Sequence, residues 1–281
     1  MARKNQSKVR LTTLLCLQSF FLILFTHHAF SAETSDWLTR DNTNKSLIDH
    51  LQWQIILDKY LVTNTESGVN LFNYKEVSSQ DQKALFTYLS TLQAQDPRRY
   101  NKAVQKAYWI NLYNALTVQL ILDNYPTKSI KKLGQTFFSF GPWDDKAATI
   151  AGEDLSLNDI EHKILRPIFK DPRIHYAVNC ASFSCPNLSA HAYTSLNIDT
   201  LLTQGAYNYI NHNRAVQIDG HDLLLSSIYD WYLVDFGGST QSLVKHLTKF
   251  AKDDLKQTLM SFKINSGDID YHYDWQLNEL K

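Results

Sequence analysis

The sequence is poor in the residues that build cofactor sites. Only nine of its 281 residues are Gly and only three are Cys. No Gly-rich phosphate-binding loop is present, so we expect no nucleotide cofactor, and we predict no other cofactor. Beyond the N-terminus there is no basic run, which makes the chain a poor candidate for binding nucleic acid or an anionic membrane. No repeat and no linker divides the chain, which favours a single domain.

The chain also lacks the composition of a disordered protein. Low hydrophobicity combined with high net charge keeps chains unfolded, and neither is found here. Apolar residues make up 44% of the sequence, aromatic residues 12%, and the formal net charge is zero. A chain of this length and composition can bury a core without help from metals or disulfides.

The N-terminus has the pattern of a secretory signal peptide. Four basic residues precede a mostly apolar stretch, Leu11 to Phe25, which is shorter than the roughly 20 residues that a membrane span needs. Ala29 and Ser31 are small residues at the positions read by a signal peptidase. We therefore predict a cleaved signal peptide at residues 1–31 and an exported protein, periplasmic or secreted, with no membrane association after cleavage. The mature chain would have 24 Lys and Arg against 28 Asp and Glu, a net charge of −4.

Apolar periodicity predicts a helix-rich domain over residues 46–281, after a polar arm at 32–45. The helical segments expected are 46–61, 79–92, 99–123, 156–166, 196–210 and one or more within 226–259. A β-hairpin is predicted from Val216 to Leu225, a late strand from Ile269, and a buried central strand from Arg173 to Asn179. The predicted fold class is α+β, a single helix-rich domain with a small sheet, for which a papain- or transglutaminase-like architecture is one candidate.

Two amides lie on one face of the longest helical segment, at Asn111 and Asn114. A buried amide must find partners, because leaving a polar group unpaired costs roughly 1–3 kcal/mol. Two interpretations stay open: the amides hold the backbone of a neighbouring loop, or they take part in chemistry.

A capping pattern begins the segment 156–166, with Ser156 at the cap and Asp159 in place of the usual Glu or Gln. Glu161 and His162 follow within one turn. Asp159 lies three residues before His162, so its carboxylate can reach the imidazole. Pro167 is expected to end the helix.

The stretch from Asp171 to Pro186 gathers the residues with the most chemical potential. It contains His175, Asn179, Cys180 and Cys185, and these two cysteines are the ones that remain after signal cleavage.

Five ordered motifs resemble the family named domain of unknown function 547. They are YWINLYNALTVQLIL (108–122), LSLNDIEHKILRPIF (155–169), DPRIHYAVNCASFSCPNL (171–188), LSSIYDWYLVDF (225–236) and YDWQLN (273–278). The resemblance brings no settled reaction. It implies a polar signature of Asn111, Asn114, Glu161, His162, Arg166, His175, Asn179, Cys180 and Cys185.

One interpretation of these residues is a thiol enzyme, since a thiolate needs a nearby His or a helix N-terminus to form at neutral pH. On the predicted strand His175 and Cys180 point to opposite faces. His162, oriented by Asp159 or Glu161, is then the better base. Cys185 is a second candidate nucleophile, because Pro186 would place it at the N-cap of a helix.

Three other interpretations stay open. Cys180 and Cys185 could form a disulfide that staples the loop, which an exported protein permits. Two His and two Cys could bind a metal, although their spacing differs from that of common zinc modules and we predict no metal. All four could also be satisfied core residues of a binding module.

The function predicted from the sequence is an exported thiol-dependent hydrolase or transferase acting on peptide or amide bonds. The alternative is a non-catalytic periplasmic binding or scaffold module with a Cys180–Cys185 disulfide. The ligand in either case is a small molecule or a peptide. The candidate catalytic residues are Cys180, Cys185, His162 and His175, and the candidate binding or orienting residues are Asn111, Asn114, Asp159, Glu161, Arg166 and Asn179.

Overall fold

The computed structural model describes residues 36–134, 141–220, 222–262 and 268–281, and these belong to one compact unit. The predicted signal peptide and the start of the predicted arm lie outside the described residues. The same holds for the aromatic residues Phe137, Phe138 and Phe140.

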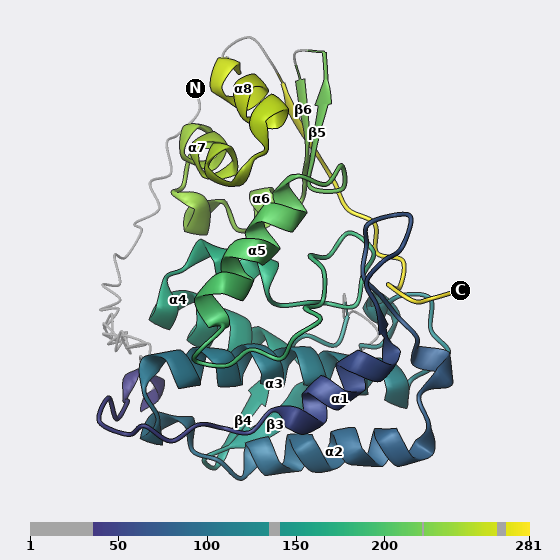
Figure 1. Cartoon of the computed structure of the whole chain (residues 1–281), viewed down its shortest axis with the longest axis vertical. Helices are drawn as coiled ribbons and strands as arrows, with labels where there is room; N and C mark the ends of the chain where they lie inside the picture. Colours follow the sequence, from purple (N-terminus) through teal and green to yellow (C-terminus); the bar gives the residue numbers. More distant parts are fainter. Residues whose placement is uncertain (1–35, 135–140, 221, 263–267) are drawn as a thin grey trace, which may run out of the picture. The chain divides into compact units, whose positions relative to one another are not determined.

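The structure confirms a helix-rich α+β fold with small sheets (Figure 1). The α-helices are α1 (Leu51–Tyr60), α2 (Ser79–Gln93), α3 (Lys102–Asp123), α4 (Arg166–Phe169), α5 (Ile198–Ile210), α6 (Ile228–Trp231), α7 (Thr240–Phe250) and α8 (Asp253–Ser261). Short 3-10 helices are η1 (Asp36–Leu38), η2 (Tyr74–Glu76), η3 (Pro97–Arg99), η4 (Ile130–Lys132), η6 (Pro172–Tyr176) and η7 (Leu233–Phe236), and η5 (Asp159–Leu165) is a π-helix.

The strands form three small sheets. They are β1 (Leu61–Val62), β2 (Leu71–Phe72), β3 (Lys146–Ile150), β4 (Glu153–Ser156), β5 (Val216–Asp219), β6 (Asp222–Ser226) and β7 (Ile269–His272). β1 pairs with β2 and β3 with β4, both antiparallel. In the third sheet β6 is antiparallel to β5, with Val216 opposite Leu225, and parallel to β7. The predicted hairpin and the late strand are therefore confirmed.

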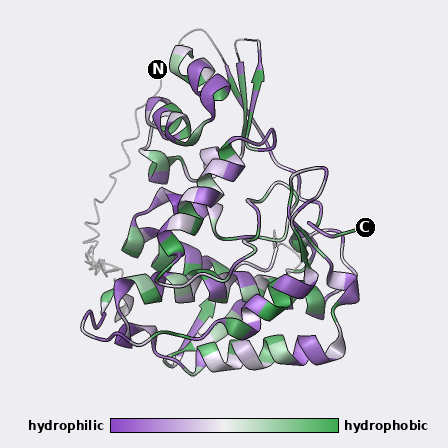
Figure 2. Ribbon diagram, viewed as in Figure 1, coloured by the Kyte–Doolittle hydropathy of each residue, from purple (hydrophilic) through white to green (hydrophobic). Residues whose placement is uncertain are grey.

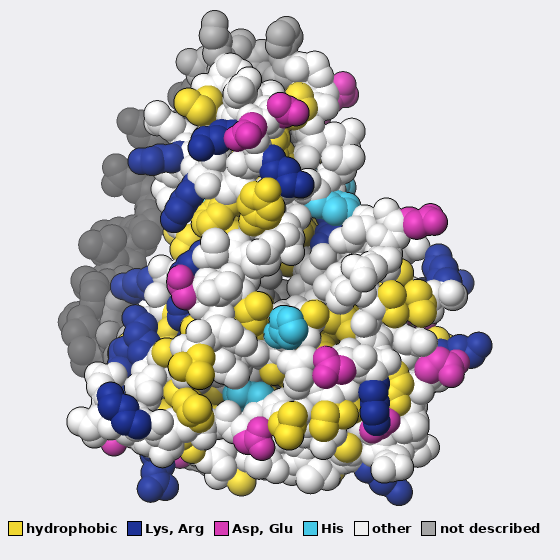
Figure 3. Space-filling model, viewed as in Figure 1, with side chains coloured by type: hydrophobic (Ala, Val, Ile, Leu, Met, Phe, Trp, Pro, Cys, Tyr) yellow, Lys and Arg dark blue, Asp and Glu magenta, His cyan; other side chains and the backbone are white. Residues whose placement is uncertain are grey.

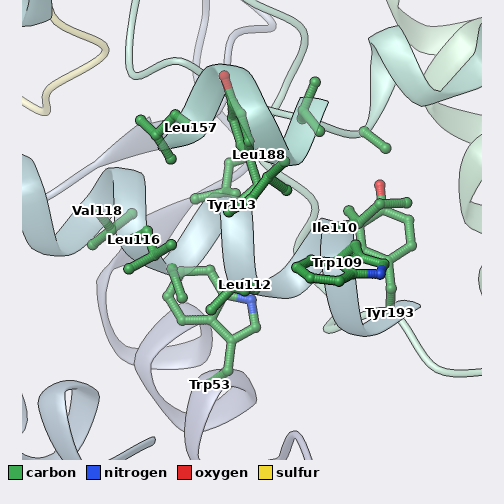
Figure 4. Close-up of a cluster of buried hydrophobic side chains, with 14 of the residues drawn as sticks. Trp53, Trp109, Ile110, Leu112, Tyr113, Leu116, Val118, Leu157, Leu188 and Tyr193 are labelled. Carbon is green, nitrogen blue, oxygen red and sulfur yellow. The ribbon is translucent and has the colours of Figure 1, made fainter. Parts of the chain in front are cut away.

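Helix α3 organises the larger hydrophobic core (Figure 4). The Asn101 side chain accepts hydrogen bonds from two N–H groups of its first turn, which fixes where the helix begins. Trp109 packs edge-on against Trp37, with ring centroids 5.2 Å apart. Trp37 is buried although it lies in the predicted polar arm, so that part of the arm packs against the domain.

A second core lies around α5, β6 and α7, and Tyr176 of η6 belongs to it. In Figure 2 hydrophobic and hydrophilic residues alternate along these helices, as expected for helices that each bury one face. Gly205 of α5 lies against η6, where an added Cβ would be 2.9 Å from the Tyr176 carbonyl oxygen. The absence of a side chain at this position therefore lets α5 pack closely against η6.

The predicted strand from Arg173 to Asn179 is wrong, because this segment begins with the 3-10 helix η6. Pro172 occupies the first turn, and the Asp171 side chain accepts a hydrogen bond from the Arg173 N–H at 3.1 Å. The same carboxylate also binds the Arg173 guanidinium. An Asp-Pro pair of this kind starts a helical turn, and here it outweighs the apolar alternation that follows.

The predicted helix 156–166 is longer and less regular than expected. Its cap is confirmed, since the Asp159 carboxylate accepts the Ser156 N–H at 2.9 Å and the Ser156 hydroxyl accepts the Asp159 N–H at 3.0 Å. The chain then forms η5 and continues through Pro167 into α4. Pro167 does not end the helix, because it lies in the first turn of α4, where a missing N–H leaves no gap.

Acid should destabilise the fold through His50, which is buried with Nδ1 2.7 Å from the Tyr88 hydroxyl. Burial lowers the pKa of His50 to about 4, against a weaker opposite effect of Asp49. The unfolded chain takes up a proton below pH ~6.5, so this stability is complete above that pH and is lost as pH falls toward 4. We expect the free energy of unfolding, measured with urea, to fall by about 2–3 kcal/mol between pH 7 and pH 4.5. The His50→Gln variant should show a smaller fall. An equal loss in that variant would contradict the assignment.

The face of the molecule in Figure 3 has acidic and basic side chains interspersed. Within the part of the chain that the structure describes, no helix has the length and apolar character that crossing a membrane requires.

Candidate active site

A cavity of about 910 Å³ brings together residues from four distant parts of the chain. Cys180 and Cys185 line it together with His175 and Glu161. Tyr113 of α3 contributes to the lining, as do Tyr232 and Tyr273 from the C-terminal part of the chain. The volume lies within the range typical of small-molecule and peptide sites.

The Cys180 thiol has hydrogen-bonding partners on three residues. Its Sγ lies 3.1 Å from Sγ of Cys185, 3.1 Å from the Ser182 hydroxyl and 3.2 Å from the Tyr273 hydroxyl. The Ser182 hydroxyl also bonds that of Tyr273, at 2.9 Å. Cys180 is partly exposed whereas Cys185 is buried, and both are free thiols.

These contacts give the two thiols different pKa values. The hydrogen bond from Cys185, with smaller contributions from Ser182 and Tyr273, lowers the pKa of Cys180 to about 7 although burial opposes this. Burial, and next the neighbouring Cys180, raise the pKa of Cys185 well above its ordinary value. A thiolate is the reactive form of cysteine, so Cys180 is the more reactive thiol of the pair.

Replacing Cys185 with alanine should therefore make Cys180 less reactive at acidic pH. Without its main hydrogen-bond donor, the pKa of Cys180 should rise from about 7 toward the ~8.5 of a free cysteine. Alkylation by iodoacetamide at pH 6 should slow about fivefold to tenfold, after allowing for the greater nucleophilicity of the more basic thiolate. The midpoint of the pH–rate profile is the decisive measurement. An unchanged midpoint would show that Cys185 does not stabilise the thiolate.

His175 lies between two carboxylates. Its Nε2 is 2.7 Å from Oδ2 of Asp235, and its Nδ1 is 3.7 Å from Oε1 of Glu161. Tyr232 stacks on the imidazole with a centroid distance of 4.2 Å and an interplanar angle of 20°. These contacts fix the ring with Nε2 against Asp235, which leaves Nδ1 on the side of Glu161.

His162 does not face the cysteines, so the preference for it as their base is wrong. It lines a separate cavity of about 440 Å³, and its Nδ1 lies 3.0 Å from the Arg166 guanidinium. Asp159 does not orient it either, since that carboxylate binds Ser156 and Lys163. In place of His162, the 3-10 turn η6 brings His175 to the cysteine cavity.

Arg166 holds the His175–Asp235 pair from the other side. Its Nε forms an ion pair with the same Oδ2 of Asp235 at 2.5 Å, and its guanidinium lies 4.8 Å from the centroid of the Tyr232 ring. Burial alone would raise the pKa of Asp235, but the hydrogen bonds from His175 and Arg166 lower it to about 2. The carboxylate therefore stays ionised at neutral pH.

The two amides of α3 hold backbone instead of lining the cavity. Asn111 donates to the Tyr193 carbonyl at 2.7 Å and accepts the Tyr193 N–H at 2.9 Å. Asn114 donates to the Ala177 carbonyl at 2.9 Å and accepts the Asn179 N–H at 2.8 Å. Of the two interpretations of these amides the structure favours the first, because both ends of each amide bind backbone, Asn114 next to Cys180 and Asn111 at Tyr193.

Asn179 closes this loop. Its side chain donates to the Pro186 carbonyl at 2.7 Å and accepts the Ala181 N–H at 2.9 Å. No helix begins at Pro186, so Cys185 is not an N-cap, and its buried thiol gains no help from helix amides. Among the described residues the next helix after the loop is α5.

Four aromatic rings form a wall of the cavity that we call the aromatic wall: Trp143, Trp231, Tyr273 and Trp275. Trp275 contacts each of the other three, at centroid distances between 4.5 and 5.6 Å. Trp231 is 47% exposed. The ammonium of Lys131 lies 5.0 Å from the centroid of the Trp275 ring.

In the sequence analysis several residues of the site are not assigned to it, among them Tyr232, Asp235 and Tyr273. Tyr232 and Asp235 lie in the motif at 225–236 and Tyr273 in the motif at 273–278, so the signal was present. The polar residues of these motifs were not assigned to the site because nothing local connects them to it. Asp235 is 60 residues from His175, and Tyr273 is 93 from Cys180.

The fold and the cavity define an α+β protein in which an acidic thiol lines the same cavity as an imidazole held by a carboxylate. Residues 97–210 match the family described as "Protein of unknown function, DUF547", which confirms the resemblance over that range. No curated protein and no solved structure matches the chain. The motifs at 225–236 and 273–278 lie beyond the matched residues, although they complete the cavity.

Proposed function

We propose that the protein is a thiol-dependent hydrolase or transferase acting on peptide or amide bonds, with Cys180 as its nucleophile. One observation carries the proposal: a partly exposed thiol with a lowered pKa lines the same cavity as a histidine held by a carboxylate. Nucleophile, proton carrier and orienting group are the three parts that covalent acyl transfer needs.

In the proposed first step the Cys180 thiolate attacks the carbonyl carbon of the amide. A sulfur–carbon bond forms, the carbon–nitrogen bond breaks, and the leaving amine takes a proton from Nδ1 of protonated His175. Asp235 holds Nε2 of the ring and stabilises the charged form. The step leaves a thioester on Cys180 and a neutral imidazole.

In the second step water, or an amine in the transferase case, attacks the thioester. Nδ1 of His175 takes a proton from the attacking molecule, the sulfur–carbon bond breaks, and Cys180 leaves as the thiolate. The acyl group departs as an acid or as a new amide. The aromatic wall and Tyr113 line the cavity in which the reacting groups would lie.

A small activated ester, p-nitrophenyl acetate, tests this proposal without knowledge of the natural substrate. We expect the acetyl group on Cys180, located by peptide mass spectrometry, followed by turnover. Cys180→Ser should abolish both, whereas His175→Gln should allow acylation and slow deacylation at least ~100-fold. Acylation of Cys180 no faster than that of a free cysteine at pH 7, or a stable thioester in the wild type, would overturn the proposal.

The location is part of the proposal. The basic and apolar pattern of residues 1–31 supports export to the periplasm or the medium. An oxidising compartment would favour the second candidate, a non-catalytic binding module with a Cys180–Cys185 disulfide, which the adjacent sulfurs favour. Non-reducing mass spectrometry of the protein recovered from its own compartment decides between them, because a quantitative disulfide leaves no resting nucleophile.

A further inference from the structure

The cavity is lined by a buried carboxyl group, that of Glu161, which is 5% exposed. In the described part of the chain no Lys or Arg forms an ion pair with it, and its ion-pair contact is with Nδ1 of His175 at 3.7 Å. Tyr232 hydrogen-bonds to it, and Tyr113 and His162 also interact with it. A buried carboxylate is costly unless it is well paired. The 3.7 Å contact to an imidazole is weaker than a direct ion pair, so a cation carried by a ligand would add to it.

A second acidic side chain of the cavity also attracts positive charge. Asp144 lines the cavity and is exposed. Among the described residues that line the cavity, Lys131 supplies the one ammonium, and this group already lies over Trp275. A cavity lined mainly by one sign of charge concentrates ligands of the opposite sign.

The aromatic rings suit the same kind of ligand. Electron-rich ring faces attract ammonium and guanidinium groups, most strongly where water is excluded. Two rings of the cavity already do so within the chain, since Lys131 lies over Trp275 and Arg166 over Tyr232. The exposed Trp231 stacks on Trp275 at 5.6 Å, which leaves ring surface open to a ligand.

We propose that the substrate carries a primary ammonium or guanidinium group, which binds between the Glu161 carboxylate and the aromatic rings of the cavity. The substrate class is then a basic peptide or an amide of a basic amino acid. This inference rests on the proposed function for the reaction, but the binding step can be tested without any reaction.

The π-helix η5 carries both Glu161 and His162, which line different cavities. In η5 the Arg166 N–H bonds the carbonyl of Glu161, five residues earlier, instead of that of His162. Such wider turns are frequent at functional sites. Glu161 lines the cavity of His175 and the cysteines, and His162 lines the neighbouring one.

Binding to the Cys180→Ser protein tests the inference with matched probes. The probes are Nα-acetyl-lysine amide and its neutral counterpart Nα-acetyl-norleucine amide, followed through the fluorescence of the cavity tryptophans. We expect the lysine amide to bind at least about tenfold more tightly. Glu161→Gln should reduce this preference to less than about threefold, whereas Glu76→Gln, at an exposed site outside the cavity, should leave it unchanged.

Equal binding of the two probes to the Cys180→Ser protein would overturn the inference, as would a preference that Glu161→Gln leaves intact. Should Glu161→Gln fail to fold by circular dichroism, Asp144→Asn and a rise in salt replace it. Each should reduce the preference in a folded protein, and no reduction by either would also overturn the inference. The proposed reaction fails separately: a protein that prefers the lysine amide but never forms a thioester is a binding module for cations.

Discussion

Replacing Asp235 with asparagine should lower the free energy of unfolding by about 2–4 kcal/mol. The same variant should slow turnover of p-nitrophenyl acetate at least ~100-fold. The carboxylate binds two groups at once, Nε2 of His175 at 2.7 Å and the Arg166 guanidinium. Asparagine has nearly the same shape, so the effect measures the lost charge and not a cavity. Arg166 would then keep its positive charge in a half-buried site beside Tyr232 and His162.

The same change should remove part of the acid sensitivity of the wild type. The pKa of Asp235 is lowered to about 2, because the bonds from His175 and Arg166 outweigh the effect of burial. A carboxyl with a lowered pKa stabilises the fold above the pKa of the unfolded chain, ~3.9, and this stability is lost as pH falls toward 2. The free energy of unfolding, measured with urea at pH 7 and at pH 3, should therefore change less in Asp235→Asn than in the wild type.

A matched control is available at Asp154, which forms an ion pair with Lys146 in which both side chains are more than half exposed. Asp154→Asn should lower the free energy of unfolding far less than Asp235→Asn does, because exposed ion pairs contribute little. An Asp235→Asn protein as stable and as active as Asp154→Asn would show that the His175–Asp235–Arg166 contacts are neither structural nor catalytic.

The helices could be read from the sequence because their signals are local. Asn101 caps α3 and an unbroken apolar pattern follows it, so the helix lies where the periodicity predicts. The hairpin of β5 and β6 has its register set by a short turn between alternating residues. Such features depend on neighbours within a few positions, which a sequence displays directly.

The error at Arg173–Asn179 shows the limit of the same method. Ile174, Tyr176 and Val178 alternate with other residues as in a strand, but Asp171 and Pro172 begin a 3-10 turn that periodicity does not register. The consequence for the site is large. On a strand His175 would point away from Cys180, whereas in the turn it lines the same cavity as both cysteines. Because this turn was predicted as a strand, His162 was favoured over His175 as the base for the cysteines.

The site itself depends on contacts that no local pattern contains. His175 finds its carboxylate 60 residues later, and Cys180 finds the Tyr273 hydroxyl 93 residues later. The π-helix likewise leaves no periodic signal, although it carries both Glu161 and His162. The residue types at the site were therefore identifiable from the sequence, but their partners were not.

Replacing Asn114 with leucine should lower the free energy of unfolding by about 2–5 kcal/mol. The amide binds the Ala177 carbonyl at 2.9 Å and the Asn179 N–H at 2.8 Å, and the residue is 1% exposed. Leucine fills a similar volume but leaves both backbone groups buried without a partner, and each such group costs ~1–3 kcal/mol. Asn124, the residue directly after α3, is the matched control, because its side chain is exposed and bonds the Leu120 carbonyl.

The Asn114→Leu change should also affect the loop that carries Cys180. Ala177 and Asn179 lie just before Cys180, so loss of the Asn114 hydrogen bonds should loosen the contacts that lower the pKa of its thiol. The midpoint of iodoacetamide alkylation of Cys180 should then move above pH 7, while Asn124→Leu should leave it in place and cost less than about 1 kcal/mol. A destabilised Asn114→Leu protein with an unmoved midpoint would show that Cys180 is acidified by the loop's own contacts. Equal stability of the two variants would show that the amide does not anchor the loop at all.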